Sequence, residues 1–445
     1  MRLRLLLKTL FKSVLLICVL ILITLFTNSC THSKDYSQSN EKQKTKLRFI
    51  SSWGGVDTKS DLLNQIFKEY MEKYPNVEII NESLNGDDFL PKIKTDFASG
   101  CDPDVFGLWP GSDIRALIKA GKVADLTDLL NTEKKWKSSF MDNAWNYTTD
   151  NGRIYGLPYE IIFEGLFINS DLFDKYNVKV PENYEDLKEA IKTFRANKII
   201  PIAYNTKEAE GTFLYQNILA SVGGKYGVEN YFIGDKIRYC YVKAMNYMKE
   251  LYDMKAFPCR EYDTVDALTL SNEDRNALFL DKKAAMIAQG SWFIGDIDIP
   301  SNESVDIIPF PDMEGGYSEK RPIIYGFGCG TFFISKVAWD NEEKQEASIN
   351  LLKEITSEKW IREFSNKGMI CNTTEGMLSI NYNRLRRTGL SLIGNAGELV
   401  GPPDSFISRT GWEEWIVDQF PYVLRGEKKA EDIWNIYMQK YEHSN

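Results

Sequence analysis

Strands and helices alternate at short spacing near the start of this chain. The pattern contains three strand-like runs and two helical ones, in the order 46–52 (strand), 60–71 (helix), 77–80 (strand), 88–98 (helix) and 104–109 (strand). We expect Ser60 to cap the first helix, Pro75 to follow it, and Gly100 to stop the second helix. Strands that are joined by helices lie parallel, with right-handed crossovers. The segment therefore predicts an α/β fold built on a parallel sheet.

The loops that follow these three strands carry aromatic and acidic residues. They begin at Trp53-Gly54-Gly55, at Asn81 and at Trp109. In open α/β sheets, ligands bind beyond the carboxyl ends of the strands. Two tryptophans and several carboxylates or amides are therefore expected at one rim, which makes this rim a candidate ligand site.

The remainder of the chain extends the alternation and then becomes mainly helical from Asn341. Asp150-Asn151-Gly152 is typical of a hairpin turn. Ser170 is expected to cap a short helix, and Gly223-Gly224 to end another. Further elements are expected at 166–169, 199–205, 284–288, 305–310 and 330–335 (strands) and at 184–196 (helix). One α/β unit followed by a second, with a return to the first, predicts two lobes joined by crossing strands.

The first thirty residues have the layout of an export signal. Arg2, Arg4, Lys8 and Lys12 precede an apolar run at 14–26, which is short for a membrane-spanning helix of about 20 residues. A cysteine, Cys30, stands at the break. The segment resembles a bacterial lipoprotein signal, which implies a signal peptide at 1–29, lipid on Cys30, a flexible tether at 30–45 and an extracytoplasmic, membrane-anchored protein. Thr27 departs from the leucine usual in such signals. An ordinary signal peptide or an uncleaved anchor remains the alternative.

Length and charge limit the classes of function. A chain of 445 residues is too long for one ordinary core and suggests two large domains. The formal net charge of −9 argues against a nucleic-acid partner, which requires a basic face. It also argues against attachment to a membrane by surface charge alone.

Histidine is almost absent, which excludes several kinds of catalysis. The two histidines are His32, in the tether, and His443, near the end. This removes histidine-based serine or cysteine catalysis and histidine-rich zinc sites. Five cysteines remain outside the signal segment, and they are expected to be mostly buried thiols because their number is odd and no close pair is present. No metal or cofactor is expected.

Short motifs along the chain resemble one family. The matches run in order: Pro103-Asp104-Val105; Leu117 through Gly121-Lys122 to Leu126; Gly152 to Pro158 (GRIYGLP); Leu166 to Asn169 with Leu172-Phe173; Pro181 with Tyr184; Lys283 to Met286 (KAAM) with Gly290-Ser291-Trp292; and Ile308-Pro309, Gly326 to Gly330 and Ile334 to Lys336. Together these motifs resemble the extracellular solute-binding proteins that feed sugars to ABC importers, the maltose-binding-like group. Tyr184 departs from the tryptophan that is usual there.

The resemblance implies a two-lobed α/β fold of the periplasmic-binding-protein type (class II), with a ligand cleft between the lobes. By analogy, lobe 1 takes 46–156 with 308–334, and lobe 2 takes 157–307 with 335–445. The lobes are expected to close around a carbohydrate by hinge motion. The many aromatic residues favour an oligosaccharide, which a monomeric, non-catalytic receptor would pass to an ABC permease.

Sugars present flat apolar faces and polar edges, so their sites need aromatic rings together with carboxylates or amides. The candidate ligand residues are Trp53, Glu82, Asp88, Trp109, Asp113, Tyr159, Glu164, Trp292, Tyr325 and Trp412. Trp292 follows a strand end and matches a family position that often stacks on sugar. About two of the acidic rim residues Asp57, Glu82, Asp88 and Asp113 are expected to meet the ligand. For every candidate, a role in the core, in a helix cap or in a structural hydrogen bond stays open.

Two other functions remain open. An exported glycoside hydrolase would need only two carboxylates about 5 to 9 Å apart and no histidine. Motif order and the lack of repeated strand–helix units of a barrel speak against it. A sensory lipoprotein that presents bound sugar to a membrane kinase would use the same fold with a different partner.

Overall fold

A computed structural model describes residues 44–229, 235–297, 303–318, 321–378 and 383–441. The expected signal peptide at 1–29, Cys30 and both histidines lie outside the described residues, as does most of the expected tether. These described residues form one compact unit. Among the described residues, no helix combines the length and apolar character needed to cross a membrane.

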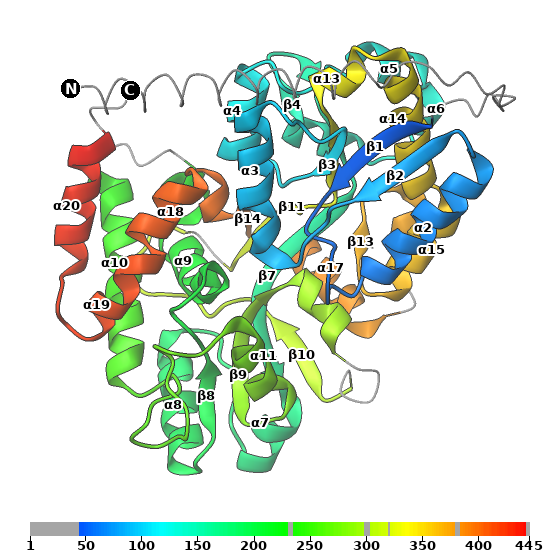
Figure 1. The fold of residues 1–445 in the computed structure, drawn as a ribbon. Coiled ribbons are helices and arrows are strands. Elements are labelled where there is room, and N and C mark those ends of the chain that lie inside the picture. The colour runs from blue at the N-terminus through cyan, green and yellow to red at the C-terminus, as the bar shows by residue number, and fades with distance from the viewer. Residues whose placement is uncertain (1–43, 230–234, 298–302, 319–320, 379–382, 442–445) are drawn as a thin grey trace, which may run out of the picture. The chain divides into compact units, whose positions relative to one another are not determined.

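The first of two large sheets has five strands in the order β2-β1-β3-β12-β6 (Figure 1). Its strands are β1 (Thr45–Ile50), β2 (Val77–Asn81), β3 (Val105–Gly107), β12 (Thr331–Ile334) and β6 (Gly156–Pro158). β1 is parallel to both β2 and β3, as the strand–helix alternation predicts, and β12 is antiparallel to β3 and β6. The intervening helices are α2 (Ser60–Lys73) and α3 (Phe89–Ser99), and Gly100 ends α3 in the left-handed conformation, as expected.

Two expected serine caps are wrong. Ser60 is the first residue of α2, and the residue before it, Lys59, makes no side-chain cap. Asp57 provides the side-chain hydrogen bond at this turn instead, because its carboxylate accepts the backbone N–H of Lys59 at 2.7 Å. Ser170 likewise begins α7 (Ser170–Tyr176) rather than capping it. The preceding Asn169 turns its amide away and donates to two carbonyls of the neighbouring segment instead.

The second sheet is organised around β7 (Glu160–Asn169), whose ten residues are all buried. Its path is β14-β11-β7-β9-β8, and two short strands also pair with β7. The other strands are β8 (Ile200–Ala203), β9 (Ala284–Gly290), β10 (Val305–Ile308), β11 (Pro322–Phe327), β13 (Ile370–Cys371) and β14 (Glu398–Val400). A separate hairpin joins β4 (Thr149–Asp150) to β5 (Arg153–Ile154), and its turn residues Asn151 and Gly152 have positive φ, which confirms the expected turn.

Helices and 3-10 turns surround both sheets. The helices are α4 (Ser112–Lys119), α5 (Thr127–Thr132), α6 (Lys134–Lys137), α8 (Tyr184–Ala196), α9 (Phe213–Glu229), α10 (Asp235–Asp253), α11 (Asn272–Leu280), α13 (Lys336–Trp339), α14 (Glu342–Ile355), α15 (Glu358–Asn366), α16 (Thr374–Leu378), α17 (Arg384–Gly394), α18 (Arg409–Trp415), α19 (Phe420–Leu424) and α20 (Ala430–Tyr441). The 3-10 turns are η1 (Gly86–Asp88), η2 (Asp142–Tyr147), η3 (Ala209–Thr212), η4 (Ser291–Asp296), η6 (Pro403–Ser405) and η7 (Val417–Gln419). Helix α8 has the expected bounds. The expected helix end at Gly223-Gly224 is confirmed, because Gly224 has a non-helical backbone (φ 57°, ψ −167°) and α9 consists of two helical segments that meet at this kink.

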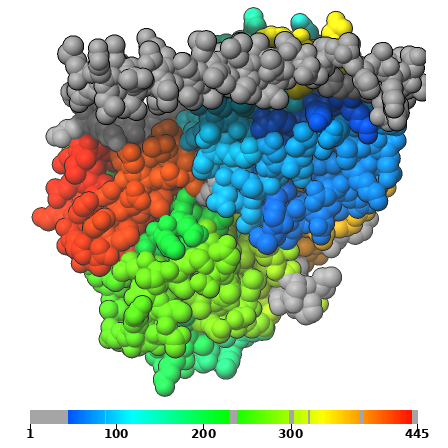
Figure 2. Space-filling model, in the orientation of Figure 1, coloured from blue at the N-terminus to red at the C-terminus, as the bar shows by residue number. Residues whose placement is uncertain are grey.

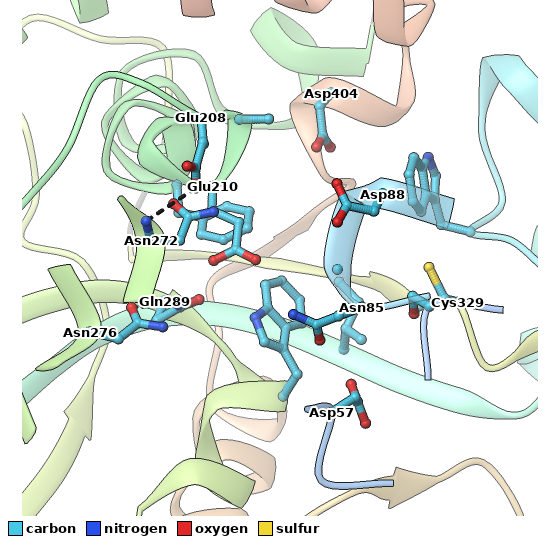
Figure 3. Close-up of a pocket in the computed structure, with 18 of the residues that line it drawn as sticks. Asp57, Asn85, Asp88, Glu208, Glu210, Asn272, Asn276, Gln289, Cys329 and Asp404 are labelled. Atoms are coloured by element: carbon cyan, nitrogen blue, oxygen red, sulfur yellow. Dashed lines mark hydrogen bonds between the residues drawn. The ribbon is translucent and has the colours of Figure 1, made fainter. Parts of the chain in front are cut away.

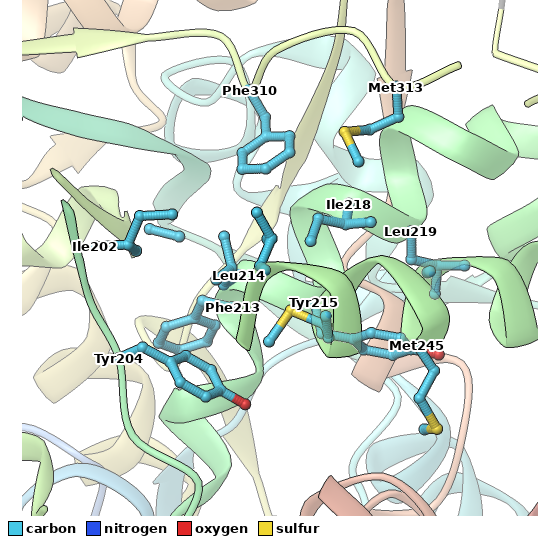
Figure 4. Close-up of a cluster of buried hydrophobic side chains, with 14 of the residues drawn as sticks. Ile202, Tyr204, Phe213, Leu214, Tyr215, Ile218, Leu219, Met245, Phe310 and Met313 are labelled. Carbon is cyan, nitrogen blue, oxygen red and sulfur yellow. The ribbon is translucent and has the colours of Figure 1, made fainter. Parts of the chain in front are cut away.

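A large apolar core packs against the second sheet. Figure 4 shows its centre, where Leu214, Tyr215 and Ile218 of α9 lie among side chains from the sheet and from α10. These residues are 2% exposed or less. Five free cysteines are described, of which Cys240 and Cys371 are buried and Cys101 is exposed, so the expected burial holds for only part of the set.

The first sheet shares its core with two C-terminal helices. Leu351 of α14 and Trp360 and Phe364 of α15 belong to the same buried cluster as Phe49 and Phe332 of the sheet. This differs from the expected placement of 335–445 in lobe 2, because the apolar faces of these helices are buried against the first sheet. Within 308–334, β12 joins the first sheet but β11 pairs with β7 in the second. The lobe limits themselves stay a prediction.

Candidate functional site

A pocket of about 940 Å³ is lined by residues that come from both sheets and from the C-terminal helices. Figure 2 shows one face of the described chain, where the surfaces of residues near 50–120, of the middle of the chain and of the C-terminal helices adjoin one another. Figure 3 shows the pocket itself, with two groups of polar side chains on opposite sides of an open space. We call these groups the N-terminal wall and the middle wall.

The N-terminal wall consists of Trp53, Asp57, Asn85, Asp88 and Trp109. These residues stand in the loops that follow β1, β2 and β3, where the parallel sheet predicts a ligand site. The loops after β1 and β2 approach closely, because Trp53 and Asn85 form an isolated backbone bridge. Gly54 permits this contact, since a Cβ atom there would stand 2.2 Å from the carbonyl oxygen of Ser83.

The middle wall consists of Glu208, Glu210, Asn272, Asn276 and Gln289. They come from the loop after β8, from the first turns of α11 and from the end of β9. The backbone N–H of Asn272 donates to Oε2 of Glu208 at 3.1 Å, the contact drawn as a dashed line in Figure 3. Five carboxylates or amides are therefore held together by contacts between separate segments.

Arg275 organises the middle wall from behind. This residue is 1% exposed, and it donates to Glu210 at 2.9 Å, to Asn205 at 3.2 Å and to the Oδ1 atom of Asn276 at 2.9 Å. The side-chain amide of Gln289 donates to the same Oδ1 atom at 3.3 Å. Because its oxygen is occupied, Asn276 is left with its NH₂ group as the donor that it can offer to a ligand.

Two buried glutamates lie on the floor of the pocket, at the start of β7. Glu164 is 2% exposed and accepts a hydrogen bond from Asn217 at 3.1 Å. Burial, with the charge of Asp404 added, raises the pKa of Glu164 well above its usual range. Glu160 accepts the backbone N–H of Gly330 at 2.9 Å, and burial also raises its pKa although Lys59 opposes the shift.

Lys59 is the buried cation of the floor. Its ammonium lies 3.2 Å from Asp57 and 5.6 Å from the ring centroid of Trp53. Burial lowers the pKa of Lys59, but the charges of Asp57 and Glu160 outweigh that effect and leave the pKa above its ordinary value. The lysine is therefore a fixed positive charge that is already held by carboxylates.

Five of the ten residues expected at the site line the pocket: Trp53, Asp88, Trp109, Glu164 and Trp292. Trp109 and Trp292 are half-buried, whereas Trp53 is 1% exposed and packs against Phe332 and Phe364. The ring of Trp292 lies over Gly290, where a Cβ atom would stand 2.1 Å from it, and 5.2 Å from the ring of Phe213. Contact of any of these residues with a ligand stays a prediction.

Two expected acidic residues, Glu82 and Asp113, lie outside the residues that line the pocket. Glu82 forms ion pairs with Arg48 at 2.8 Å and with Lys92 at 2.5 Å. Arg48, as a hydrogen-bond donor, lowers the pKa of Glu82 to about 2. Asp113 pairs with Lys94 at 3.1 Å. The carboxylates of Glu82 and Asp113 are therefore each held in ion pairs with lysine or arginine side chains from the N-terminal part of the chain.

Three expected aromatic residues are core residues outside the pocket lining: Tyr159, Tyr325 and Trp412. Tyr159 is fully buried, and its ring packs near Phe332 of the first sheet and Phe364 of α15. Tyr325 packs on Tyr147, and the indole N–H of Trp412 donates to Thr212 at 3.1 Å. The buried position of Trp412 agrees with the alternative interpretation of this residue as part of the core face of a helix.

The middle wall is absent from the sequence-based set of candidates. One signal for it is Gln289, a polar residue inside the buried apolar strand β9 and directly before the Gly290-Ser291-Trp292 motif. The acidic loop residues Glu208 and Glu210 could not be recognised as site residues from the sequence, because exposed acidic residues are common in loops.

Comparison with known proteins gives related sequences and folds. A family model described as bacterial extracellular solute-binding protein matches residues 57–354. A multiple sugar-binding protein of Streptococcus mutans is 24% identical over 287 residues, which are 63% of this chain and 65% of that protein. The melibiose/raffinose/stachyose-binding protein MelE of Bacillus subtilis is 21% identical over 304 residues, 66% of this chain and 67% of MelE. The chain thus matches about two thirds of the length of these relatives.

A solved chitin oligosaccharide binding protein superposes with a TM-score of 0.79 at 21% identity, covering 90% of this chain and 98% of that one.

Proposed function

This chain belongs to the family of bacterial extracellular solute-binding proteins, and we propose that it is a receptor that captures a carbohydrate and delivers it to the permease of an ABC importer. The family is one of binding proteins and not of enzymes, so the chain binds its solute without converting it. The names of the two curated relatives, which both refer to sugars, support a carbohydrate as the solute.

The observation that carries the proposal is the combination of rings and polar groups in one pocket. Trp109 and Trp292 are half-buried at its surface, beside the carboxylates and amides of both walls. Aromatic faces suit the apolar C–H faces of a sugar, and carboxylates and amides suit its hydroxyl groups. A volume of about 940 Å³ lies at the upper end of small-molecule sites, so an oligosaccharide is the ligand we propose.

Closure of the two walls on the ligand is the proposed working motion. The N-terminal wall stands on the first sheet, while the middle wall stands on the second. Tyr159, between β6 and β7, and the segment 328–330, between β11 and β12, connect the two sheets. A hinge at such crossing segments would bring the walls together. A ligand can drive that closure only if it binds the closed form more tightly than the open one.

Attachment to the membrane is proposed from the sequence pattern alone. Cleavage after residue 29 would leave lipid on Cys30, and the polar stretch 30–45 would tether the receptor to the outer side of the membrane. Such a receptor would act as a monomer and present its closed form to the permease. A sensory partner in the membrane is the alternative that this arrangement equally allows.

Thermal unfolding of the purified protein against a panel of mono- and oligosaccharides tests the proposal. A ligand at 100 times its Kd adds about 2.7 kcal/mol to stability, which raises the midpoint visibly. We expect such a rise with one class of sugar, recovered intact afterwards, and a much smaller rise for the variant Trp292→Ala. A cleaved sugar would contradict a pure binding function, and no rise with any sugar would remove the carbohydrate assignment.

A further inference from the structure

The pocket is far more acidic than the chain as a whole. Eleven aspartates and glutamates line it, against three lysines and arginines. The whole chain contains 63 acidic and 54 basic residues, which is close to balance. The charge of the pocket is therefore a local feature that composition does not explain.

Two of the three cations that line the pocket are engaged by carboxylates of the same lining. Lys59 pairs with Asp57 at 3.2 Å, and Arg409 donates to Glu413 at 2.9 Å. The third, Lys207, is exposed. Within the described part of the chain, no lysine or arginine nitrogen lies within 4.0 Å of the carboxylates of Asp88, Glu164 and Glu208, although the charge of the buried Arg275 acts on Glu208. Asp88 and Glu208 lie on opposite walls of the pocket (Figure 3), and Glu164 lines its floor.

Enclosing these carboxylates around a ligand has a physical consequence. Water is displaced when the site fills, and a carboxylate that loses its water without gaining a positive partner is strongly disfavoured. On the floor of the pocket, burial already disfavours the charged form of Glu164, and its pKa is raised for this reason. Neutral hydroxyl groups satisfy carboxylates as hydrogen-bond donors but leave their charge uncompensated, whereas an ammonium group does both.

We propose that the pocket selects carbohydrates that carry free amino groups, with their ammonium groups facing the carboxylates of Asp88 and Glu208. This inference rests on the proposed function, because it names the class of sugar for the same site. The half-buried rings of Trp109 and Trp292 fit it as well, since an aromatic face attracts a nearby cation in addition to a sugar ring. The NH₂ group of Asn276 remains as a donor for ring or hydroxyl oxygens.

Matched pairs of sugars test the inference. Glucosamine, galactosamine and mannosamine, together with glucosamine oligomers, are titrated by calorimetry beside counterparts that carry a hydroxyl or an acetamido group in place of the amine. We expect the free amines to bind about tenfold or more tightly, with a preference that fades at high salt and at a pH where the amine is neutral. Neutral counterparts that bind equally well or better would overturn the amine preference while the carbohydrate receptor stands. If no member of any pair binds while another sugar of the wider panel raises the unfolding midpoint, the amine preference fails alone; if no sugar of that panel does, the proposed function itself fails.

Two variants separate a charge effect from a general loss of the site. Glu208→Gln and Asp88→Asn keep the shape and the acceptor oxygen of each side chain but remove its charge. Each is expected to lower affinity for the amine about tenfold and to lower affinity for the neutral counterpart clearly less, because the amide keeps one acceptor oxygen for a hydroxyl group. Glu72→Gln, at an exposed position on α2, makes the same change of net charge outside the pocket lining and should alter neither affinity. Equal losses for the amine and for its neutral counterpart would contradict the inference, provided that unchanged unfolding midpoints show the variants to be folded.

Discussion

The two walls of the pocket are built on different principles. The N-terminal wall consists of loops at the ends of parallel strands, and the indole of Trp53 in this wall packs within the apolar core. The middle wall is assembled from a loop, a helix start and a strand end. A buried arginine, Arg275, joins the helix start to the loop, and Gln289 of the strand end donates to Asn276 of the helix. One wall thus depends on apolar packing, and the other on a buried polar network. Removing a residue should therefore damage the walls in different ways.

The largest effect is expected for Trp53→Ala in the N-terminal wall. The indole is 1% exposed and contacts the rings of Phe332, at 5.4 Å, and Phe364, at 5.1 Å. Its loss should lower the free energy of unfolding by about 3 to 5 kcal/mol, measured by urea denaturation. Trp109→Ala, at a half-buried position of the same wall, is the control and should cost clearly less stability. A stable Trp53→Ala variant that fails to bind would instead place the indole in the ligand site.

In the middle wall, Arg275→Met should be the most damaging change. It removes the Arg275 donor from Asn205, Glu210 and Asn276, of which Asn276 keeps only Gln289, and removing one partner of a buried pair costs about 3 kcal/mol. Ligand affinity should fall further than stability predicts, because Glu210 and Asn276 lose their orientation. Lys92→Met, which removes a partly exposed ion pair outside the pocket lining, should cost about 1 kcal/mol or less. Equal effects of the two variants on affinity would contradict the organising role of Arg275.

The difference between the walls also explains what the sequence could predict. The N-terminal wall follows from three strand-like runs and one rule about parallel sheets, so Trp53, Asp88 and Trp109 could be placed at the pocket. The middle wall requires knowledge of which loop meets which helix. Ser271 and Asp274 look like an ordinary helix start, and the structure indeed shows Ser271 capping α11. Nothing local in the sequence indicates that the next turn, around Arg275, supports a binding surface.

Glu82, which lies next to the N-terminal wall, shows where the rule that ligands bind beyond the carboxyl ends of parallel strands reaches its limit. It directly follows β2, but side chains alternate along a strand, so its position beside β2 does not settle which way it points. Its carboxylate lies on the side of Arg48 and Lys92, away from the residues that line the pocket. The fold class and the order of elements need only patterns of apolar residues, whereas the direction of one side chain past the end of a strand depends on its charged neighbours.

A pH series on Glu164→Gln should sharpen the contrast between the floor and the surface. Because the pKa of Glu164 is raised in the folded state, the folded chain keeps this proton at pH values where the unfolded chain, with a pKa of about 4.3, has lost it. Stability should therefore fall as pH rises above the unfolded value, until the folded pKa is reached. The variant should remove this slope and gain on the order of 1 kcal/mol at neutral pH. Parallel pH curves for the two proteins would mean that Glu164 ionises as freely as an exposed carboxylate.

The smallest effect is expected for Glu82→Gln, and its sign should be opposite. Arg48 holds the folded pKa of Glu82 at about 2, below the unfolded value, so its contribution is present above that unfolded value and is lost as pH falls toward 2. For a partly exposed ion-pair cluster, the loss at neutral pH should be about 0.5 kcal/mol, measured by urea unfolding, with a flatter acid limb in the variant. Ligand affinity should not change, since the carboxylate lies outside the pocket lining. A variant with normal stability and weakened binding would show that the N-terminal wall extends beyond Asn85 to Glu82, and that the ion pairs of Glu82 open when the ligand arrives.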